Sequence, residues 1–267
     1  MMQEALSHAV VTGAASGVGA AVVRRLLDDG YCVHAFDIDD GRLRALKEQM
    51  GSGRLMTMVG DVCSPASVAG LRQMLQDDEA RLDVLVCCAG VLRVAPLAET
   101  SEQDWDSLFS VNVKGAFLMM QALTPLMIRE AGLPRACVVV LTSAAAVRPK
   151  TGGGAYAATK AALTQIVKVW AVELAPHGLN VNAVAPGTVN TPMAAGLASA
   201  GGGFALSGKA PIGRMAEAVD IADAISLLYD RRAHFVTGAV LAVDGGLTAA
   251  FVPPSPPVPS IVSIRKS

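Results

Sequence analysis

The stretch TSAAAVRPKTGGGAYAATK, residues 142–160, joins two regions of different periodicity. Before it, residues 136–141 (ACVVVL) form a short apolar run rich in β-branched residues, which is typical of a strand buried on both faces. After it, a helical stripe begins at Ala155 and contains Leu163, Ile166, Val167, Trp170 and Leu174. The stretch is therefore predicted to lead from a strand of an α/β sheet into the next helix, at the sheet edge where ligands bind.

Reactive side chains lie within this stretch. Ser143 follows the strand, and Tyr156 and Lys160 are four positions apart, so they share one face of the helix. A free tyrosine has a pKa of about 10, and a nearby ammonium favours its phenolate, so we expect Lys160 to lower the pKa of Tyr156. Ser143 would then orient a substrate oxygen while hydride moves at the adjacent carbon. The alternative is a capping serine, an exposed tyrosine and a solvated lysine.

Composition excludes several classes of protein. The chain has 267 residues, of which 52% are hydrophobic and 17% charged, and its net charge of -1 gives no electrostatic basis for binding nucleic acid or acidic lipid. It shows no signal-peptide pattern and no apolar run approaching about 18 residues. We expect a soluble cytoplasmic protein with no nucleic acid, membrane or metal partner. The cysteines lack metal-ligand spacing, and their odd number suits a reducing compartment: Cys32, Cys63, Cys87, Cys88 and Cys137.

A glycine-rich turn follows the first predicted strand. Residues 8–12 (HAVVT) lead into residues 13–19 (GAASGVG), and a helical pattern then runs to Gly30. Glycines allow a tight turn and close backbone approach, so that a pyrophosphate can meet the helix N-terminus. The spacing is Gly-x-x-x-Gly-x-Gly rather than Gly-x-Gly-x-x-Gly, and taken alone it is equally typical of a plain turn.

The second predicted strand, residues 31–36 (YCVHAF), ends in Asp37. An acidic residue about 20 positions beyond the glycine turn is placed to bond the ribose hydroxyls of a dinucleotide. A 2′-phosphate would face this carboxylate, and neither Ser16 nor Ile38 offers a compensating cation. NAD is therefore predicted in preference to NADP. The alternative is that Asp37 caps the following helix.

The rest of the chain alternates strands with helices. Strands are predicted over residues 54–62, running into Asp61, over 82–88 and over 239–243, with a helix capped by Ser64 and another over 217–229. Such alternation predicts a single-domain, Rossmann-type doubly wound parallel sheet with helices on both faces, over residues 1–250. The proline-rich residues 251–267 are predicted to be a disordered or extended arm.

Taken in order, these motifs resemble the short-chain dehydrogenase/reductase family over roughly residues 7–250. The resemblance rests on Thr12–Gly19, Asp61, Ala89–Gly90, Asn112, Ser143, Tyr156, Lys160 and Pro186–Gly187. It implies an oxidoreductase in which the serine, tyrosine and lysine are catalytic and Asn112 supports the lysine through water. It also implies a cofactor site formed by Gly13, Ser16, Gly17, Val18, Gly19, Asp37, Asp61, Val62, Cys88, Ala89, Gly90, Tyr156, Lys160, Pro186, Gly187, Val189 and Thr191.

The chain departs from the family at Cys87–Cys88, where an asparagine usually precedes Ala89–Gly90. A redox role for these neighbouring thiols and buried, inert thiols are the two interpretations. Residues 194–210 are rich in glycine, alanine and serine and are predicted to form a mobile lid over the substrate, or else a plain surface loop.

The sequence gives less information about the substrate than about the fold or the cofactor. Arg93 after Ala89–Gly90 gives a local similarity to 2,3-dihydro-2,3-dihydroxybenzoate dehydrogenases, and an arginine matches a carboxylate bidentately. Arg93 and Arg148 are therefore candidate substrate residues, with solvated surface arginines as the alternative. A general secondary alcohol or ketone, a carboxylated cyclic dihydrodiol, and a non-catalytic NAD-binding sensor or scaffold all remain open as functions.

The helix that begins at Ala155 is apolar almost all round, since Ala158, Val169 and Val172 lie outside its main stripe. Burial on two sides predicts packing on the sheet and on another subunit. A homo-oligomer is expected, and the family resemblance implies a dimer or homotetramer.

Overall fold

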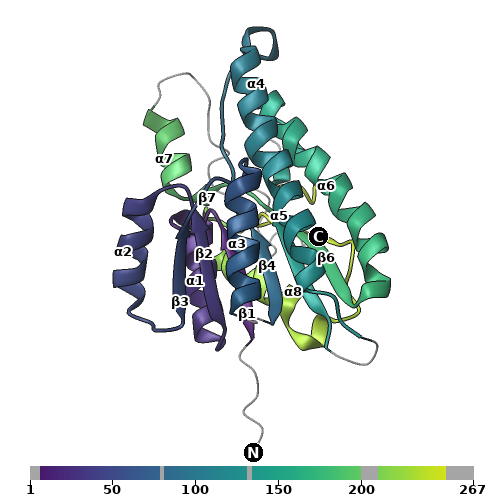
Figure 1. The fold of residues 1–267 in the computed structure, drawn as a ribbon. Helices are drawn as coiled ribbons and strands as arrows, with labels where there is room; N and C mark the ends of the chain where they lie inside the picture. The colour runs from purple at the N-terminus through teal and green to yellow at the C-terminus, as the bar shows by residue number, and fades with distance from the viewer. Residues whose placement is uncertain (1–6, 79–80, 131–133, 200–209, 251–267) are drawn as a thin grey trace, which may run out of the picture.

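The structure, a computed structural model, describes residues 7–78, 81–130, 134–199 and 210–250. Within them a seven-stranded parallel sheet has the order β3-β2-β1-β4-β5-β6-β9 (Figure 1). The strands are β1 (His8–Thr12), β2 (Cys32–Asp37), β3 (Leu55–Val59), β4 (Leu82–Cys87), β5 (Ala136–Leu141), β6 (Leu179–Pro186) and β9 (Val240–Val243). The chain winds outward from β1 to β3 and then returns to β4 on the other side of β1. This reversal confirms the predicted doubly wound fold and places its switch point between β1 and β4.

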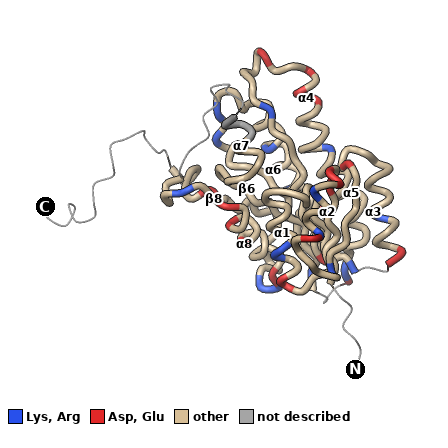
Figure 2. Tube along the Cα trace, turned by 90° about the vertical axis from the view of Figure 1, so that its left-hand side faces the viewer, with Lys and Arg blue, Asp and Glu red and all other residues tan. Residues whose placement is uncertain are grey.

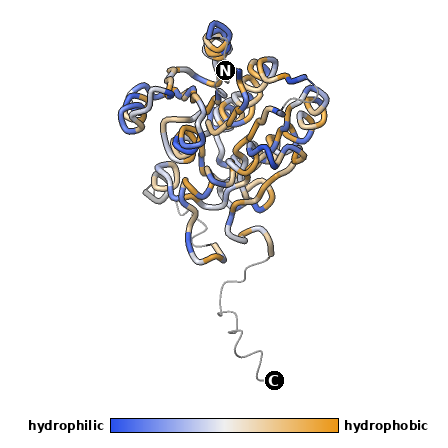
Figure 3. Tube along the Cα trace, turned by 90° about the horizontal axis from the view of Figure 1, so that it is seen from below, coloured by the Kyte–Doolittle hydropathy of each residue, from blue (hydrophilic) through white to orange (hydrophobic). Residues whose placement is uncertain are grey.

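Helices cover the sheet in two layers, each with its own apolar core. One layer contains α3 (Pro65–Asp77), α5 (Ala116–Leu123) and α6 (Gly154–Leu174), and the other contains α1 (Gly17–Asp28), α2 (Asp40–Met50) and α8 (Ala218–Tyr229). Paired residues of neighbouring strands share a face, so Val10, Leu85 and Val138 enter the first core. Seen from below, hydrophobic segments concentrate toward the middle of the molecule (Figure 3). The residues of β5 are buried up to Val140, as its sequence predicts.

Local capping explains where several helices begin. The Ser64 hydroxyl accepts a hydrogen bond from the Ser67 N–H at 3.2 Å, with Pro65 in the first helical position, as predicted for α3. At the start of α8, Glu217 and Asp220 form a reciprocal capping box. These caps set the chain's entry into helices on opposite faces of the sheet.

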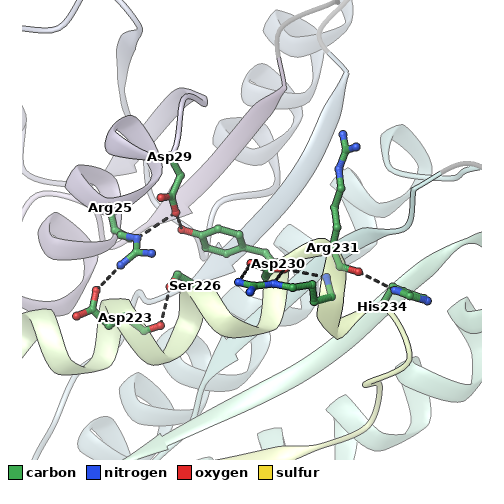
Figure 4. Close-up of polar contacts among 9 residues, drawn as sticks. Arg25, Asp29, Asp223, Ser226, Asp230, Arg231 and His234 are labelled. Atoms are coloured by element: carbon green, nitrogen blue, oxygen red, sulfur yellow. Dashed lines mark hydrogen bonds and ion pairs between the residues drawn. The ribbon is translucent and has the colours of Figure 1, made fainter.

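Helices α1 and α8 are also joined by a polar network on the surface (Figure 4). Arg25 pairs with Asp29 at 3.0 Å and with Asp223 at 2.7 Å, and the Tyr229 hydroxyl donates to Asp29 at 2.6 Å. Exposed ion pairs of this kind contribute at most about 1 kcal/mol each, so apolar burial supplies most of the contact between these helices. Charges of both signs are spread over the surface (Figure 2).

Strand β6 has no counterpart among the predicted strands, because two asparagines interrupt its apolar pattern. Both are buried and hydrogen-bonded to the segment before β9: Asn180 donates to the His234 carbonyl at 2.9 Å and Asn182 to the Val236 carbonyl at 2.8 Å. Fully satisfied amides of this kind are tolerated inside a sheet. The hydrogen bonds of these two asparagines hold the segment before β9 against β6.

Part of the predicted lid and the predicted arm lie outside the described residues, namely 200–209 and 251–267. The first part of the lid is helical, since α7 spans Pro192–Ser199. A small second sheet pairs β7 (Val189–Asn190) with β8 (Ala216–Glu217). In the part of the chain that the structure describes, no helix is both long and apolar enough to cross a membrane.

A pair of histidines lies at the amino-terminal end of the sheet. His34 is 1% exposed, its Nε2 lies 3.0 Å from Nδ1 of His8, and its own Nδ1 has no hydrogen-bond partner among the described residues. Burial, reinforced by the neighbouring His8, lowers the pKa of His34 from 6.5 to about 4. His34 is therefore neutral in the folded protein over most of the physiological range.

The lowered pKa of His34 predicts that the protein loses stability in mild acid. In the unfolded chain His34 takes up a proton near pH 6.5, whereas in the folded chain it does so only near pH 4. The folded state is therefore destabilised progressively as the pH falls from about 6.5 toward about 4. We expect His34 to remove about 2 kcal/mol from the free energy of unfolding between about pH 7.5 and about pH 5. Urea unfolding of the wild type and of His34→Gln measures this difference. Equal pH slopes for the two proteins would contradict it.

Candidate active site

A cavity of about 720 Å³ opens at the carboxyl ends of the strands. Its volume lies in the range of roughly 300–1,000 Å³ that is usual for small-molecule and cofactor sites. Segments that follow β1, β2 and β3 line one side, and segments that follow β4, β5 and β6 line the other. The cavity therefore spans the switch point, where open α/β sheets bind their ligands.

The glycine turn after β1 needs residues without side chains. A Cβ on Gly13 would lie 2.7 Å from the Ala89 Cα, and one on Gly19 would lie 2.0 Å from the Gly13 carbonyl oxygen. Gly17 and Val18, in the first turn of α1, line the cavity, and the first N–H groups of a helix have no acceptor within it. The turn therefore fits the pyrophosphate of a dinucleotide.

Asp37 lies at the end of β2 and lines the cavity. Its carboxylate accepts hydrogen bonds from the N–H groups of Ala15 and Asp39, each at 3.0 Å. The residue that caps α2 is Asp39, which accepts from the Arg42 N–H at 3.0 Å. The alternative that Asp37 caps this helix is therefore wrong. Asp61 lines the same end of the cavity.

A cation at this end escaped the sequence analysis. Arg42, in the first turn of α2, lines the cavity, and its Nε lies 3.2 Å from Oδ2 of Asp39. Both side chains are largely exposed. In the sequence, a compensating cation was sought only at Ser16 and Ile38, whereas one helical turn brings a residue five positions beyond Asp37 back toward the cavity.

The predicted catalytic residues converge in this cavity. Ser143 follows β5, and its hydroxyl is hydrogen-bonded to the Tyr156 phenol. Nζ of Lys160 donates to the Leu141 carbonyl at 2.8 Å and lies 5.7 Å from the centroid of the Tyr156 ring. The expected geometry of the trio is therefore present in the folded chain.

The electrostatics of the pair differ from the expectation. Burial raises the pKa of Tyr156 above its ordinary value, and the hydrogen bond with Ser143 only partly opposes this. Burial also lowers the pKa of Lys160 to about 8. In the chain by itself the pKa of Tyr156 is therefore raised rather than lowered, because its phenol is removed from water and the Lys160 ammonium is directed to a backbone carbonyl. At neutral pH the tyrosine is a phenol and the lysine remains mostly protonated.

Asn112 supports the site from behind the cavity wall. It is 1% exposed and lies in the π-helical turn η2 (Ser110–Gly115), between α4 (Glu102–Phe109) and α5. Its amide accepts from the Val91 N–H at 2.8 Å, and donates to the Val91 carbonyl at 3.0 Å and to the Thr159 hydroxyl at 3.1 Å. Single π-helical turns are often found at functional sites.

Thr159 is a residue that the sequence analysis missed. Its hydroxyl donates to the Tyr156 carbonyl at 2.7 Å while it accepts from Asn112. Asn112 therefore connects the segment after β4 with the turn of α6 that carries the tyrosine. The three-residue spacing between Tyr156 and Thr159 is the only signal in the sequence that could have indicated this.

All the predicted cofactor-binding residues line the cavity, including Val62, Cys88, Ala89, Gly90, Pro186, Gly187, Val189 and Thr191. Burial raises the pKa of the Cys88 thiol to about 12 and also raises that of Cys87. Both side chains are therefore thiols at neutral pH, which favours inert cysteines over a redox pair.

The two candidate substrate arginines have different surroundings. Arg93 is exposed, its Nε lies 3.5 Å from Oδ1 of Asp104, and it is absent from the residues that line the cavity. Arg148 does line the cavity, together with Lys150 and Leu247, which were not predicted. Of the two arginines, only Arg148 therefore lines the cavity.

The parallel sheet is doubly wound, and a glycine turn lines the cavity at its switch point. These two features define the Rossmann-type α/β class. Comparison with known proteins narrows this class. The family model described as enoyl-(acyl carrier protein) reductase matches residues 13–248. The chain belongs to the short-chain dehydrogenase/reductase family of oxidoreductases, which binds a nicotinamide cofactor.

Relatives agree with this assignment. The chain is 36% identical over 240 residues to the 3-oxoacyl-[acyl-carrier-protein] reductase FabG of Thermotoga maritima, covering 89% of this chain and 96% of that protein. It is 37% identical over 246 residues to the cis-4-hydroxycyclohexanecarboxylate dehydrogenase of Sinomonas cyclohexanicum, covering 90% and 96%. The crystal structure of 3-ketoacyl-(acyl-carrier-protein) reductase from Brucella melitensis complexed with NADH is similar with a TM-score of 0.81 at 26% identity, covering 91% and 98%.

The glycine turn gives a test of the cofactor site. Gly19→Ala places a Cβ against the Gly13 carbonyl, so the turn must open, and we expect the affinity for NADH to fall by about tenfold or more. Gly53→Ala is the matched control, since its Cβ would meet nothing within 4 Å. Titration of NADH fluorescence measures both. Unchanged affinity in Gly19→Ala would show that the cofactor does not use this turn.

Proposed function

We propose that the protein is an NAD-dependent dehydrogenase/reductase that transfers hydride between NAD(H) and a secondary alcohol or ketone. The observation that carries this proposal is the convergence of Ser143, Tyr156 and Lys160 on one cavity with the glycine turn. A bound nicotinamide dinucleotide supplies the hydride acceptor or donor. The residues of this chain bind and orient the reactants and move the proton.

Tyr156 is the proposed acid and base. Because burial keeps its phenol protonated, it is ready to give a proton to a carbonyl oxygen when a ketone is reduced. In the oxidation of an alcohol it must first lose that proton, and the Lys160 ammonium then stabilises the phenolate. Ser143 holds the substrate oxygen through its hydroxyl. Asn112 holds the turn of α6 next to Lys160 in place through Thr159. The proposed water relay to Lys160 would begin at Asn112.

NAD is the proposed cofactor. Asp37 lines the cavity at the end of β2, where a carboxylate bonds ribose hydroxyls and repels a 2′-phosphate. The Brucella reductase whose structure contains NADH supports this choice. Arg42 weakens it, because a guanidinium beside Asp39 is a ready partner for a phosphate. The charge balance between Asp37 and Arg42 therefore decides the preference.

The alternatives are less well supported. Oxidation of a carboxylated cyclic dihydrodiol was suggested chiefly by Arg93, which does not line the cavity. A non-catalytic sensor has no need of a serine, a tyrosine and a lysine gathered at one site. We retain the general alcohol or ketone as the substrate class.

We also propose a cytoplasmic homo-oligomer, a dimer or tetramer, formed through α6. One face of this helix packs in the core, and on another face Val169 is 55% and Val172 76% exposed. Exposed valines on this helix favour its burial against a second copy of the chain.

Removing the phenol tests the catalytic role. Tyr156→Phe should lower kcat by at least about 100-fold with each alcohol or ketone that the wild type turns over, because the proton donor is gone. The affinity of the Tyr156→Phe variant for NADH should stay within about twofold of that of the wild type. Tyr31→Phe serves as the control, because Tyr31 packs against the core beneath α1 and does not line the cavity. Steady-state kinetics and NADH titration measure these effects. A variant that keeps most of its activity would remove Tyr156 as the acid.

The acidic residue tests cofactor preference. Asp37→Ala should reduce the preference for NAD over NADP by about tenfold or more, and Arg42→Ala in that background should reverse the gain in NADP use. Asp40→Ala is the control, since Asp40 pairs with Arg44 and does not line the cavity. The ratio of kcat/KM values for the two cofactors is the readout. A wild type that prefers NADP would overturn the proposal for NAD.

A further inference from the structure

Charges of opposite sign predominate on the two sides of the cavity. The acidic residues that line it within the described chain, Asp37, Asp39 and Asp61, lie at the end of β2 or after β2 and β3, and Arg42 is beside them. Arg148 and Lys150 line it from the segment after β5, across the switch point. We refer to these two residues as the cationic pair. The pair therefore lies on the side of the cavity that holds Ser143 and Tyr156.

Arg148 is held in this position by the chain that follows β9. Its guanidinium donates to the Leu247 carbonyl, and Leu247 itself lines the cavity. The turn that carries Leu247 is organised by Asp244, whose carboxylate accepts from the N–H groups of Gly246 at 2.9 Å and Thr248 at 2.8 Å. Asp244 is only 7% exposed. Arg148 is exposed, but its guanidinium is thus held against an ordered turn.

Among the described residues, no carboxylate forms an ion pair with Arg148. Burial and the charge of Arg148 lower the pKa of Lys150 from its ordinary value. Two cations this close disfavour each other's charge, and an anion bound beside them relieves that cost.

We propose that the cationic pair binds a carboxylate of the substrate, so that the physiological substrate is a secondary hydroxy acid or the corresponding oxo acid. This proposal rests on the proposed function, because Ser143 and Tyr156 mark where the reacting carbon lies. A guanidinium matches both oxygens of a carboxylate, and an ammonium adds a point charge. The carboxylate takes no part in hydride transfer and leaves unchanged.

The pyrophosphate of the cofactor is not the anion that the pair recognises. The glycine turn and the first N–H groups of α1 serve that group, and they follow β1. The cationic pair follows β5, two strands away. A separate anion, belonging to the substrate, is therefore the occupant that fits.

A binding experiment tests the pair without requiring turnover. Calorimetry on the NADH-loaded protein compares cyclohexanecarboxylate with cyclohexanecarboxamide, which differ in charge. We expect the acid to bind at least about tenfold more tightly, and the Arg148→Gln/Lys150→Gln double variant to lose that preference. Arg93→Gln, which removes an exposed arginine outside the cavity, should retain it. Equal affinities in the wild type, or an unchanged preference in a double variant that melts as the wild type does, would overturn the proposal.

A second measurement separates this inference from the proposed function. The ratio of kcat/KM for 3-hydroxycyclohexanecarboxylate to that for its methyl ester should exceed about 10 in the wild type and fall toward 1 in the double variant. If the protein binds the acid selectively but oxidises no alcohol with either cofactor, the proposed function fails and the cationic pair stands. If neutral alcohols are turned over with no preference for acids, the pair fails and the proposed function stands.

Discussion

The site depends on the contact between the backbone at the ends of β1 and β4. Gly13 has no side chain, so its turn can lie directly against Ala89, and the Thr12 hydroxyl accepts the Ala89 N–H at 3.2 Å. This contact sets the position of the segment after β4. Asn112 is hydrogen-bonded to Val91 in that segment and to Thr159, and Thr159 is hydrogen-bonded to the Tyr156 carbonyl in α6. Each link is a buried or partly buried hydrogen bond, whose loss would leave a polar group without a partner.

Burial explains the charge states in the cavity. Lys160 is buried against the Leu141 carbonyl, and no carboxylate is needed to hold it. Its pKa falls to about 8 while burial raises that of Tyr156, so the resting pair is a phenol beside an ammonium. The apolar surroundings that shape the site therefore set its protonation as well.

The sequence predicted most of the fold because the relevant signals are local. The apolar run of β5, the glycine turn, and the four-residue spacing of Tyr156 and Lys160 each depend on neighbours along the chain. What escaped prediction depends on contacts between distant segments. Strand β6 was hidden by Asn180 and Asn182, which are satisfied by residues more than fifty positions away.

The site residues that were missed or misplaced have a similar explanation. Arg42 and Lys150 enter the cavity because a helix turn and a loop fold back toward it, whereas Arg93 lies outside it, near Asp104 on the surface. The direction of the Tyr156 pKa could not be inferred from spacing, because it is set by burial of the phenol, which outweighs the hydrogen bond with Ser143. A periodic pattern shows which residues share a helix face, but not how much water reaches them.

The switch point between β1 and β4 has a further consequence for how this molecule can change. Strands β1 to β3, with Asp37, Arg42 and Asp61, come from one continuous part of the chain, whereas the loop after β5 and the wall around Asp244 come from another. The two parts meet at the close contact of Gly13 with Ala89. Mutation or recombination in one part can therefore alter the choice of coenzyme while changes in the other independently diversify the substrates, provided that the contact between the two parts is preserved.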